Sequence, residues 1–205
     1  MSTFESSFCA IKKKIFDYEP FDGNDEVGNL MVHIITTDEE TGDVDIIKLR
    51  VKEAYMSFYM RDQISRQLDL LKNDFTNWKP VNILIPTKFS DKYLSKMIGL
   101  YMSNHYNNLP KPISFPINDE NSVCTFDQWF IKMIKNRKSK NGRSQFVKVL
   151  EMADYLDIPH LIELLCALIA YVNRGYQLNH VLKMMNVDKK LGQVEISKIL
   201  TDEYA

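Results

Sequence analysis

The side chains that could carry chemistry are few and widely spaced in this chain of 205 residues. They are His33, His105, His160 and His180, together with Cys9, Cys124 and Cys166. None of the histidines has a cysteine or carboxylate partner at the short spacing that is typical of metal-binding motifs. The sequence therefore predicts no metal site, and we expect the histidines to be exposed or hydrogen-bonded within the fold.

Patterns that indicate catalysis are missing from the sequence as well. The seven glycines are dispersed and form no phosphate-binding loop, and no Gly-x-Ser-x-Gly nucleophile motif occurs. Cys166 falls on the apolar side of a predicted helix, where a buried, unreactive thiol is expected. We therefore predict a protein that is not an enzyme and that needs no cofactor.

The charge and the cysteine content limit the partners and the compartment. The net charge is −1, and the basic run from Lys135 to Arg143 has no aromatic residues among its cations, so a solvated loop is favoured over a phosphate contact. The longest apolar run, Leu164 to Val172, is far shorter than the about 20 residues that a membrane helix needs. Three widely separated cysteines indicate reduced thiols. A cytoplasmic or nuclear protein without nucleic-acid or membrane partners is expected.

The elements that would position these residues follow the order β-β-α-β-α, and only helices come after them. Strands are predicted at 30–36, 44–51 and 81–85, and helices at 52–71, 90–105 and 125–134. Adjacent Ile46 and Ile47 break the alternation of the second strand, which suggests a bulge or a strand end. Strands early and helices late predict the α+β class. The expected organisation is an N-terminal extension (1–28), a main domain (29–174, with loops near 107–123 and 135–144) and a helical C-terminal extension (175–205).

The segment from Phe146 to Gly175 predicts two amphipathic helices joined at a corner. Apolar residues recur at one helical face in each half: Phe146, Val149, Leu150 and Ala153, then Leu161, Leu164, Leu165, Leu168 and Val172. Asp157 is expected to cap the second helix, Pro159 to lie in its first turn, and Gly175 to end it. Further helices are expected at 178–185 and 194–200. Composition alone fits both a partner-binding groove and ordinary packing of these apolar faces.

The sequence of this helix pair resembles that of a known family. Ala153-Asp154-Tyr155-Leu156-Asp157-Ile158 is similar to the "A-N-Y-L-D-I" motif of the S-phase-kinase-associated adaptors, which join F-box proteins to a cullin in SCF ubiquitin ligases. The segment from Cys124 to Phe130 resembles the family's "V-W-D-Q-E-F" element, and the segment from Met185 to Val187 resembles its "F-N-I". The family pattern has asparagine where this chain has Asp154, which places a negative charge at the corresponding position.

The resemblance implies a BTB/POZ fold, a small sheet flanked by helices, with a helical extension that binds an F-box. The F-box-facing residues that it implies are Phe146, Leu150, Ile162, Cys166, Ile169, Val181, Met185 and Val187. The cullin-facing pair that it implies is Asp154 and Tyr155. The leading hypothesis is a non-catalytic adaptor that bridges an F-box protein and a cullin and so positions a substrate for ubiquitination. The alternative is an assembly subunit of the same fold that binds F-box proteins or forms a homodimer without a cullin.

Overall fold

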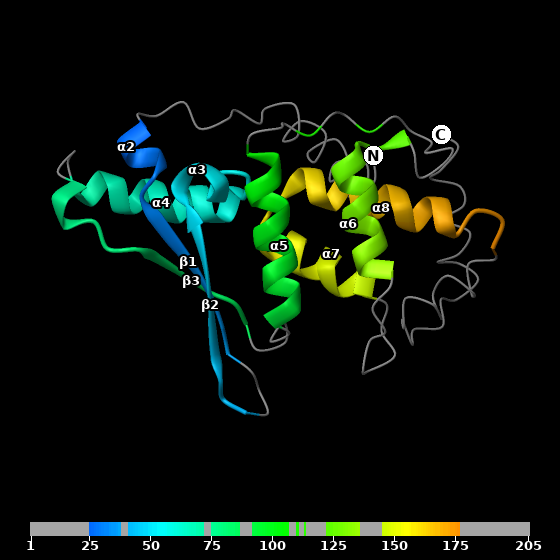
Figure 1. The fold of residues 1–205 in the computed structure, drawn as a ribbon, viewed down its shortest axis with the longest axis horizontal. Helices are drawn as coiled ribbons and strands as arrows, with labels where there is room; N and C mark the ends of the chain where they lie inside the picture. Colours follow the sequence, from blue (N-terminus) through cyan, green and yellow to red (C-terminus); the bar gives the residue numbers. More distant parts are fainter. Residues whose placement is uncertain are drawn as a thin grey trace, which may run out of the picture.

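A small mixed sheet and the helices packed around it make this an α+β chain, as the order of elements predicted (Figure 1). The computed structural model describes residues 25–37, 41–71, 75–86, 92–106, 110, 113, 122–135 and 145–176. A short helix, α2 (Asp25–Gly28), comes first, and its Val27 is buried. The extension predicted for residues 1–28 therefore ends in a packed helical turn, and residues 1–24 lie outside the described residues.

The sheet has three strands in the order β2-β1-β3. β1 (Met31–Thr37) and β2 (Val44–Arg50) form an antiparallel hairpin, while β3 (Val81–Leu84) pairs with the other side of β1 in the parallel sense. The indole N–H of Trp78 donates to the carbonyl of Met31 over 3.1 Å, so the residues before β3 are also tied to the start of β1. All three predicted strands are confirmed.

One face of the sheet is buried and the other carries an open apolar row. Val32, Ile34 and Thr36 of β1 are at most 1% exposed, and the alternation places Ile35 on the opposite face. Ile35 pairs with Ile46 on one side and with Leu84 on the other, and these two partners are 47% and 67% exposed. The register of β1 and β2 is continuous through Ile46 and Ile47, so neither the bulge nor the strand end suggested at these residues is present. The two isoleucines instead face opposite sides of the sheet.

The helix predicted at 52–71 is divided into α3 (Val51–Ala54) and α4 (Phe58–Leu71). Ser57 lies between them, and its fully buried hydroxyl explains the break. That hydroxyl accepts a 3.0 Å bond from the N–H of Met60, in the first turn of α4, and donates to the carbonyl of Leu156. A serine in this position satisfies a free N–H group at the start of a helix, which favours a new helix over a continued one.

α5 (Lys92–His105) stands between the sheet and the later helices, where it packs against both (Figure 1). Gly99 is the point of close approach between α5 and β2. A Cβ atom at this position would lie 2.9 Å from Cγ2 of Ile47, so the absence of a side chain allows the helix to lie close to the strand. A short 3-10 turn, η1 (Phe75–Asn77), precedes β3.

The remaining helices are α6 (Thr125–Lys135), α7 (Gln145–Tyr155) and α8 (Pro159–Val172). Two residues of the loop predicted at 107–123, Ile113 and Val123, are buried, so parts of this loop pack on the core. Residues 136–144 of the second predicted loop lie outside the described residues. Gly175 follows α8 with a φ of +78°, as expected for a helix stop. The helices predicted at 178–185 and 194–200 also lie outside the described residues.

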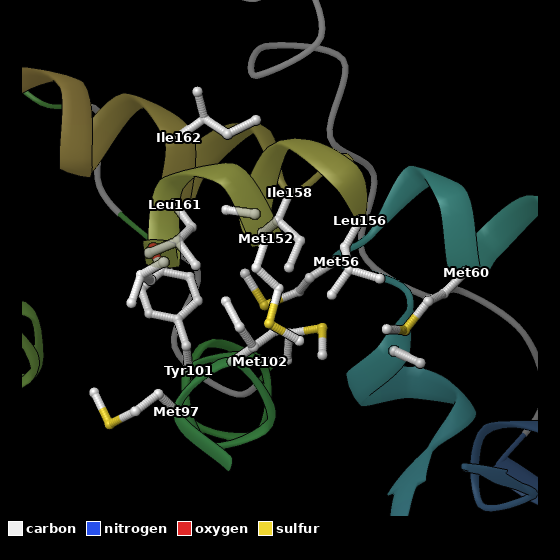
Figure 2. Packing of buried hydrophobic residues seen from close by; sticks show 14 of the residues in the cluster. Met56, Met60, Met97, Tyr101, Met102, Met152, Leu156, Ile158, Leu161 and Ile162 are labelled. Carbon is white, nitrogen blue, oxygen red and sulfur yellow. The ribbon is translucent and has the colours of Figure 1, made fainter. Parts of the chain in front are cut away.

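The hydrophobic core continues from the covered face of the sheet through α5 to the α7–α8 pair, and it is rich in methionine (Figure 2). Met60, Met97, Met102 and Met152 are each at most 1% exposed and come from α4, α5 and α7. Unbranched, polarizable methionine side chains fill irregular gaps between packed helices. The core thereby fixes the α7–α8 pair against α5 and the sheet.

Candidate interaction surfaces

The corner between α7 and α8 is built from a C-terminal cap of the first helix. Asp157 adopts a φ of +49°, the left-handed conformation that Asp and Asn tolerate better than most residues. Its N–H donates to the carbonyl of Asp154 over 3.0 Å, and the N–H of Ile158 donates to the carbonyl of Ala153 over 2.9 Å. This bond pair, with Ile158 and Ala153 both fully buried, is a Schellman motif.

Asp157 therefore lies one residue before the N-cap position of the second helix and does not occupy it. The N-cap position of α8 belongs to Ile158, which forms no side-chain capping bond, and Pro159 occupies the first turn as predicted. Asp157 closes α7 instead. Its carbonyl also accepts a 2.9 Å bond from the N–H of Phe58 at the start of α4. The corner is thus held by the sheet domain as well as by its own backbone.

The residues implied to face an F-box occupy positions of graded exposure on α7 and α8. Phe146 and Leu150 are half-buried and pack against the core, and Ile162 is 9% exposed. Cys166 and Ile169 follow one and nearly two turns later on α8, where Cys166 is exposed and Ile169 is half-buried. The spacing places Ile162, Cys166 and Ile169 along one strip of the helix. Val181, Met185 and Val187 lie outside the described residues.

Two expectations for α8 are wrong. Cys166 was expected to be a buried thiol, and it is exposed. Val172 was expected to continue the buried stripe, and it is 39% exposed, whereas Leu161, Leu164, Leu165 and Leu168 are buried. The protein around Cys166 still raises the pKa of its thiol by desolvation, and the nearby Asp154 carboxylate adds to this. The thiol therefore stays protonated at neutral pH, which disfavours a nucleophilic role.

The implied cullin-facing pair lies where the end of α7 meets β3 and α4. Asp154 is exposed, whereas Tyr155 is half-buried against the Tyr59 ring, with 5.6 Å between the ring centroids. The Tyr155 hydroxyl donates to the carbonyl of Leu84 over 3.3 Å. Desolvation and the hydrogen bond with Tyr59 raise the pKa of Tyr155, so its hydroxyl is neutral at physiological pH. Asp154 thus presents its charge to solvent beside an aromatic pair.

A buried polar cluster between α5 and α6 was not predicted. His105, the last residue of α5, places Nε2 2.9 Å from Oδ1 of Asp127, and the Cys124 thiol donates to Oδ2 of the same carboxylate over 3.0 Å. Nearby, the Tyr101 hydroxyl lies 2.6 Å from Nδ1 of His160. The sequence signal was present in the Cys124-x-x-Asp127 spacing at the start of a predicted helix. The third member, His105, was overlooked because it lies 22 residues from Asp127.

The geometry around Cys124 explains how the start of α6 is capped. The carbonyl of Cys124 accepts a 3.0 Å bond from the N–H of Gln128, so Cys124 occupies the N-cap position of α6. Burial raises the pKa of the Cys124 thiol, and its hydrogen bond to the Asp127 carboxylate raises it further, while bonds from the backbone N–H groups of Asp127 and Phe126 lower it in part. The net result is a protonated thiol that donates to Asp127.

Among the helices that the structure describes, none has both the length and the apolar character that crossing a membrane requires. Comparison of the sequence with protein-family models gives no match, and comparison with curated proteins gives no significant match. The function therefore has to be inferred from the residues and surfaces of this chain.

Proposed function

We propose that this chain is a non-catalytic adaptor of the SCF type, with a BTB/POZ-like sheet domain that contacts a cullin and C-terminal helices that hold an F-box protein. The observation that carries the proposal is the α7–α8 pair, whose sequence resembles the adaptor motif and whose outer strip leaves apolar side chains accessible. Cys166 is exposed on this strip, and Ala170, one turn further, is exposed as well.

The position of the strip supports this role. Leu161, Leu164, Leu165 and Leu168 anchor α8 in the core, whereas the strip reaches the surface at Cys166, which is exposed, and at Ile169, which is half-buried. An F-box segment on this strip would be held on a rigid support, because α8 is fixed through the Schellman corner and the Ser57 bonds. Binding one partner here and a second beside Tyr155 raises the effective concentration of a substrate near the ligase.

Gel filtration of the full chain with an F-box segment and with a cullin N-terminal domain tests this proposal. Co-elution with both partners is expected. Replacing Ile169 by Glu should abolish F-box co-elution because a carboxylate would be buried without a partner. Replacing Tyr155 by Ala should weaken only the cullin complex. Leu70→Glu is the matched control, since Leu70 is 82% exposed on α4 and lies in neither surface. Failure of the unaltered chain to bind any F-box segment would refute the proposal.

The alternative, an assembly subunit that forms a homodimer or binds F-box proteins without a cullin, is favoured by a different observation. Ile46, Ile35 and Leu84 form a row across all three strands, and Val44 at the end of the hairpin is 58% exposed. An apolar row on an open sheet face suits contact with a second copy of the chain. A concentration-dependent dimer that is abolished by Ile46→Lys, in a chain that binds no cullin, would replace the adaptor proposal with this one.

A further inference from the structure

Three side chains of different chemistry converge between the end of α5 and the start of α6. His105 offers an imidazole nitrogen, Cys124 a sulfur and Asp127 a carboxylate oxygen, and these donor atoms all lie within 4.8 Å of one another. The adaptor proposal gives this cluster no role, because it lies neither on the outer strip of α8 nor beside Tyr155.

The cluster is enclosed by aromatic rings. The side chain of His105 is 1% exposed and that of Asp127 is 4% exposed. The ring of Tyr101 lies 4.5 Å from the His105 ring, centroid to centroid, and the ring of Phe126 meets it edge-on at 5.1 Å. Cys124 is only half-buried, so it connects the cluster with solvent. The cluster therefore combines two ligands in a desolvated interior, where ionic bonds are strong, with a third ligand that solvent can reach.

The donor set selects one class of ion. A thiolate is a soft ligand that Mg²⁺ and Ca²⁺ do not favour, whereas imidazole nitrogen, thiolate sulfur and carboxylate oxygen are all ligands of Zn²⁺. One thiolate and one carboxylate also carry two negative charges, which balance a divalent cation when the histidine is neutral. A neutral complex avoids the cost of leaving net charge in a buried site.

We propose that His105, Cys124 and Asp127 form a Zn²⁺ site that joins the C-terminal end of α5 to the N-terminal end of α6. In the present arrangement the Asp127 carboxylate accepts a hydrogen bond from each of the other two side chains. When the ion binds, it takes the place of the two protons that these hydrogen bonds share. The Cys124 thiol loses its proton to solvent. The proton on Nε2 of His105 moves to Nδ1, so the imidazole stays neutral and Nε2 can bind the ion. The three side chains would supply three ligands, and a water molecule would complete a tetrahedral site.

The donors have to rearrange to hold the ion. With bonds of about 2.0–2.3 Å from Zn²⁺ to N, O and S ligands, neighbouring donors of a tetrahedral site lie roughly 3.3–3.7 Å apart. The present hydrogen bonds to Asp127 use different oxygens: Nε2 of His105 lies 2.9 Å from Oδ1, and Sγ of Cys124 lies 3.0 Å from Oδ2. With one ligand atom from each residue, the donors lie within 4.8 Å of one another. Donors now in hydrogen-bonding contact have to separate by a few tenths of an ångström, and the most distant pair has to approach by up to about 1 Å.

Cobalt titration of the full, reduced and metal-stripped chain tests the site. Co²⁺ should bind with one equivalent per chain and give the charge-transfer band of a cobalt–thiolate bond, and added Zn²⁺ should displace it. In Cys124→Ser, which keeps a hydroxyl to donate to Asp127, the band should vanish. The affinity of this variant for Co²⁺ should fall by more than the roughly 10–100-fold that is lost when a residue that hydrogen-bonds to a metal ligand is replaced. Cys166→Ser is the matched control for loss of a thiol, and its charge-transfer band and affinity for Co²⁺ should equal those of the unaltered chain.

A second measurement uses the unaltered chain and so does not depend on the folding of a variant. Zn²⁺ should protect Cys124 from alkylation by iodoacetamide, as read by mass spectrometry of peptides, while the exposed Cys166 should react at the same rate with and without the ion. A charge-transfer band that persists in Cys124→Ser would overturn the proposal. Equal alkylation of Cys124 in the presence and absence of saturating Zn²⁺ would overturn it as well.

Discussion

Replacing Ser57 by Ala should destabilise the chain because one small hydroxyl connects two helices. The hydroxyl caps α4 through the N–H of Met60 and donates to the carbonyl of Leu156 at the end of α7. Loss of a serine cap costs about 1 kcal/mol, within a range of about 0.5–2 kcal/mol. Leaving a buried carbonyl without its donor adds about 1–3 kcal/mol. The side chain is fully buried, so water cannot replace either bond without opening the junction.

The expected loss in the free energy of unfolding is therefore about 2–4 kcal/mol, which corresponds to a fall in Tm of roughly 4–16 °C for a chain of this size. Urea unfolding followed by circular dichroism measures the loss directly. Ser65→Ala, in the half-buried middle of the same helix and away from this junction, is the matched control and should change stability by no more than about 0.5 kcal/mol. If Ser57→Ala proves as stable as that control, the hydroxyl does not hold α4 to α7, and the explanation for the break in the predicted helix fails.

Two further changes probe other buried polar groups. Replacing Tyr101 by Phe removes the hydroxyl that lies 2.6 Å from Nδ1 of buried His160, and a loss of about 1–3 kcal/mol is expected in urea unfolding; an unchanged midpoint would contradict the hydrogen bond. Burial alone would raise the pKa of Glu53, but bonds from the guanidinium and N–H of Arg50 lower it below its ordinary value of 4.5. Because a lowered folded-state pKa stabilises the fold above the unfolded-state value, this contribution is present above about pH 4.5 and is lost as the pH falls through the folded-state pKa. The free energy of unfolding, measured from neutral to acid pH, should show this loss. In Glu53→Gln the free energy of unfolding should fall less steeply with decreasing pH. Equal slopes in the variant and the unaltered chain would contradict the prediction.

Periodicity predicted the strands and helices of the described residues well, because apolar spacing reports which face is buried. It could not predict how β3 pairs, since a short alternating strand has the same pattern in parallel and antiparallel sheets. The break at Ser57 was missed for a related reason. The apolar pattern runs on through residues 52–71, and the hydroxyl that interrupts it bonds to Leu156, which is remote in the sequence.

The residues of the candidate surfaces were predicted with uneven success for physical reasons. Asp157 is a residue type that both starts and ends helices. Only the backbone bonds from Asp157 to Asp154 and from Ile158 to Ala153 show that it ends α7. Cys166 was placed on the apolar side of α8 from spacing alone, yet the structure leaves it exposed. The meeting of His105 with Asp127 depends on how α6 packs beside α5. That packing depends on tertiary contacts that no local pattern contains.

The parallel pairing of β3 with β1 also has a consequence for the order of folding. The β1–β2 hairpin forms between neighbouring segments, whereas the contact between Trp78 and Met31 closes a loop of 47 residues before β3 can pair. Closing such a loop costs entropy that only later contacts repay, so β3 should join the sheet after the hairpin and α4 have formed. The Tyr155 hydroxyl can then reach Leu84 only at that stage. The surface around Asp154 and Tyr155 is therefore complete only after two long-range contacts have formed: the pairing of β3 with β1, and the docking of the α7–α8 corner on Ser57, which lies 99 residues from Leu156 in the sequence.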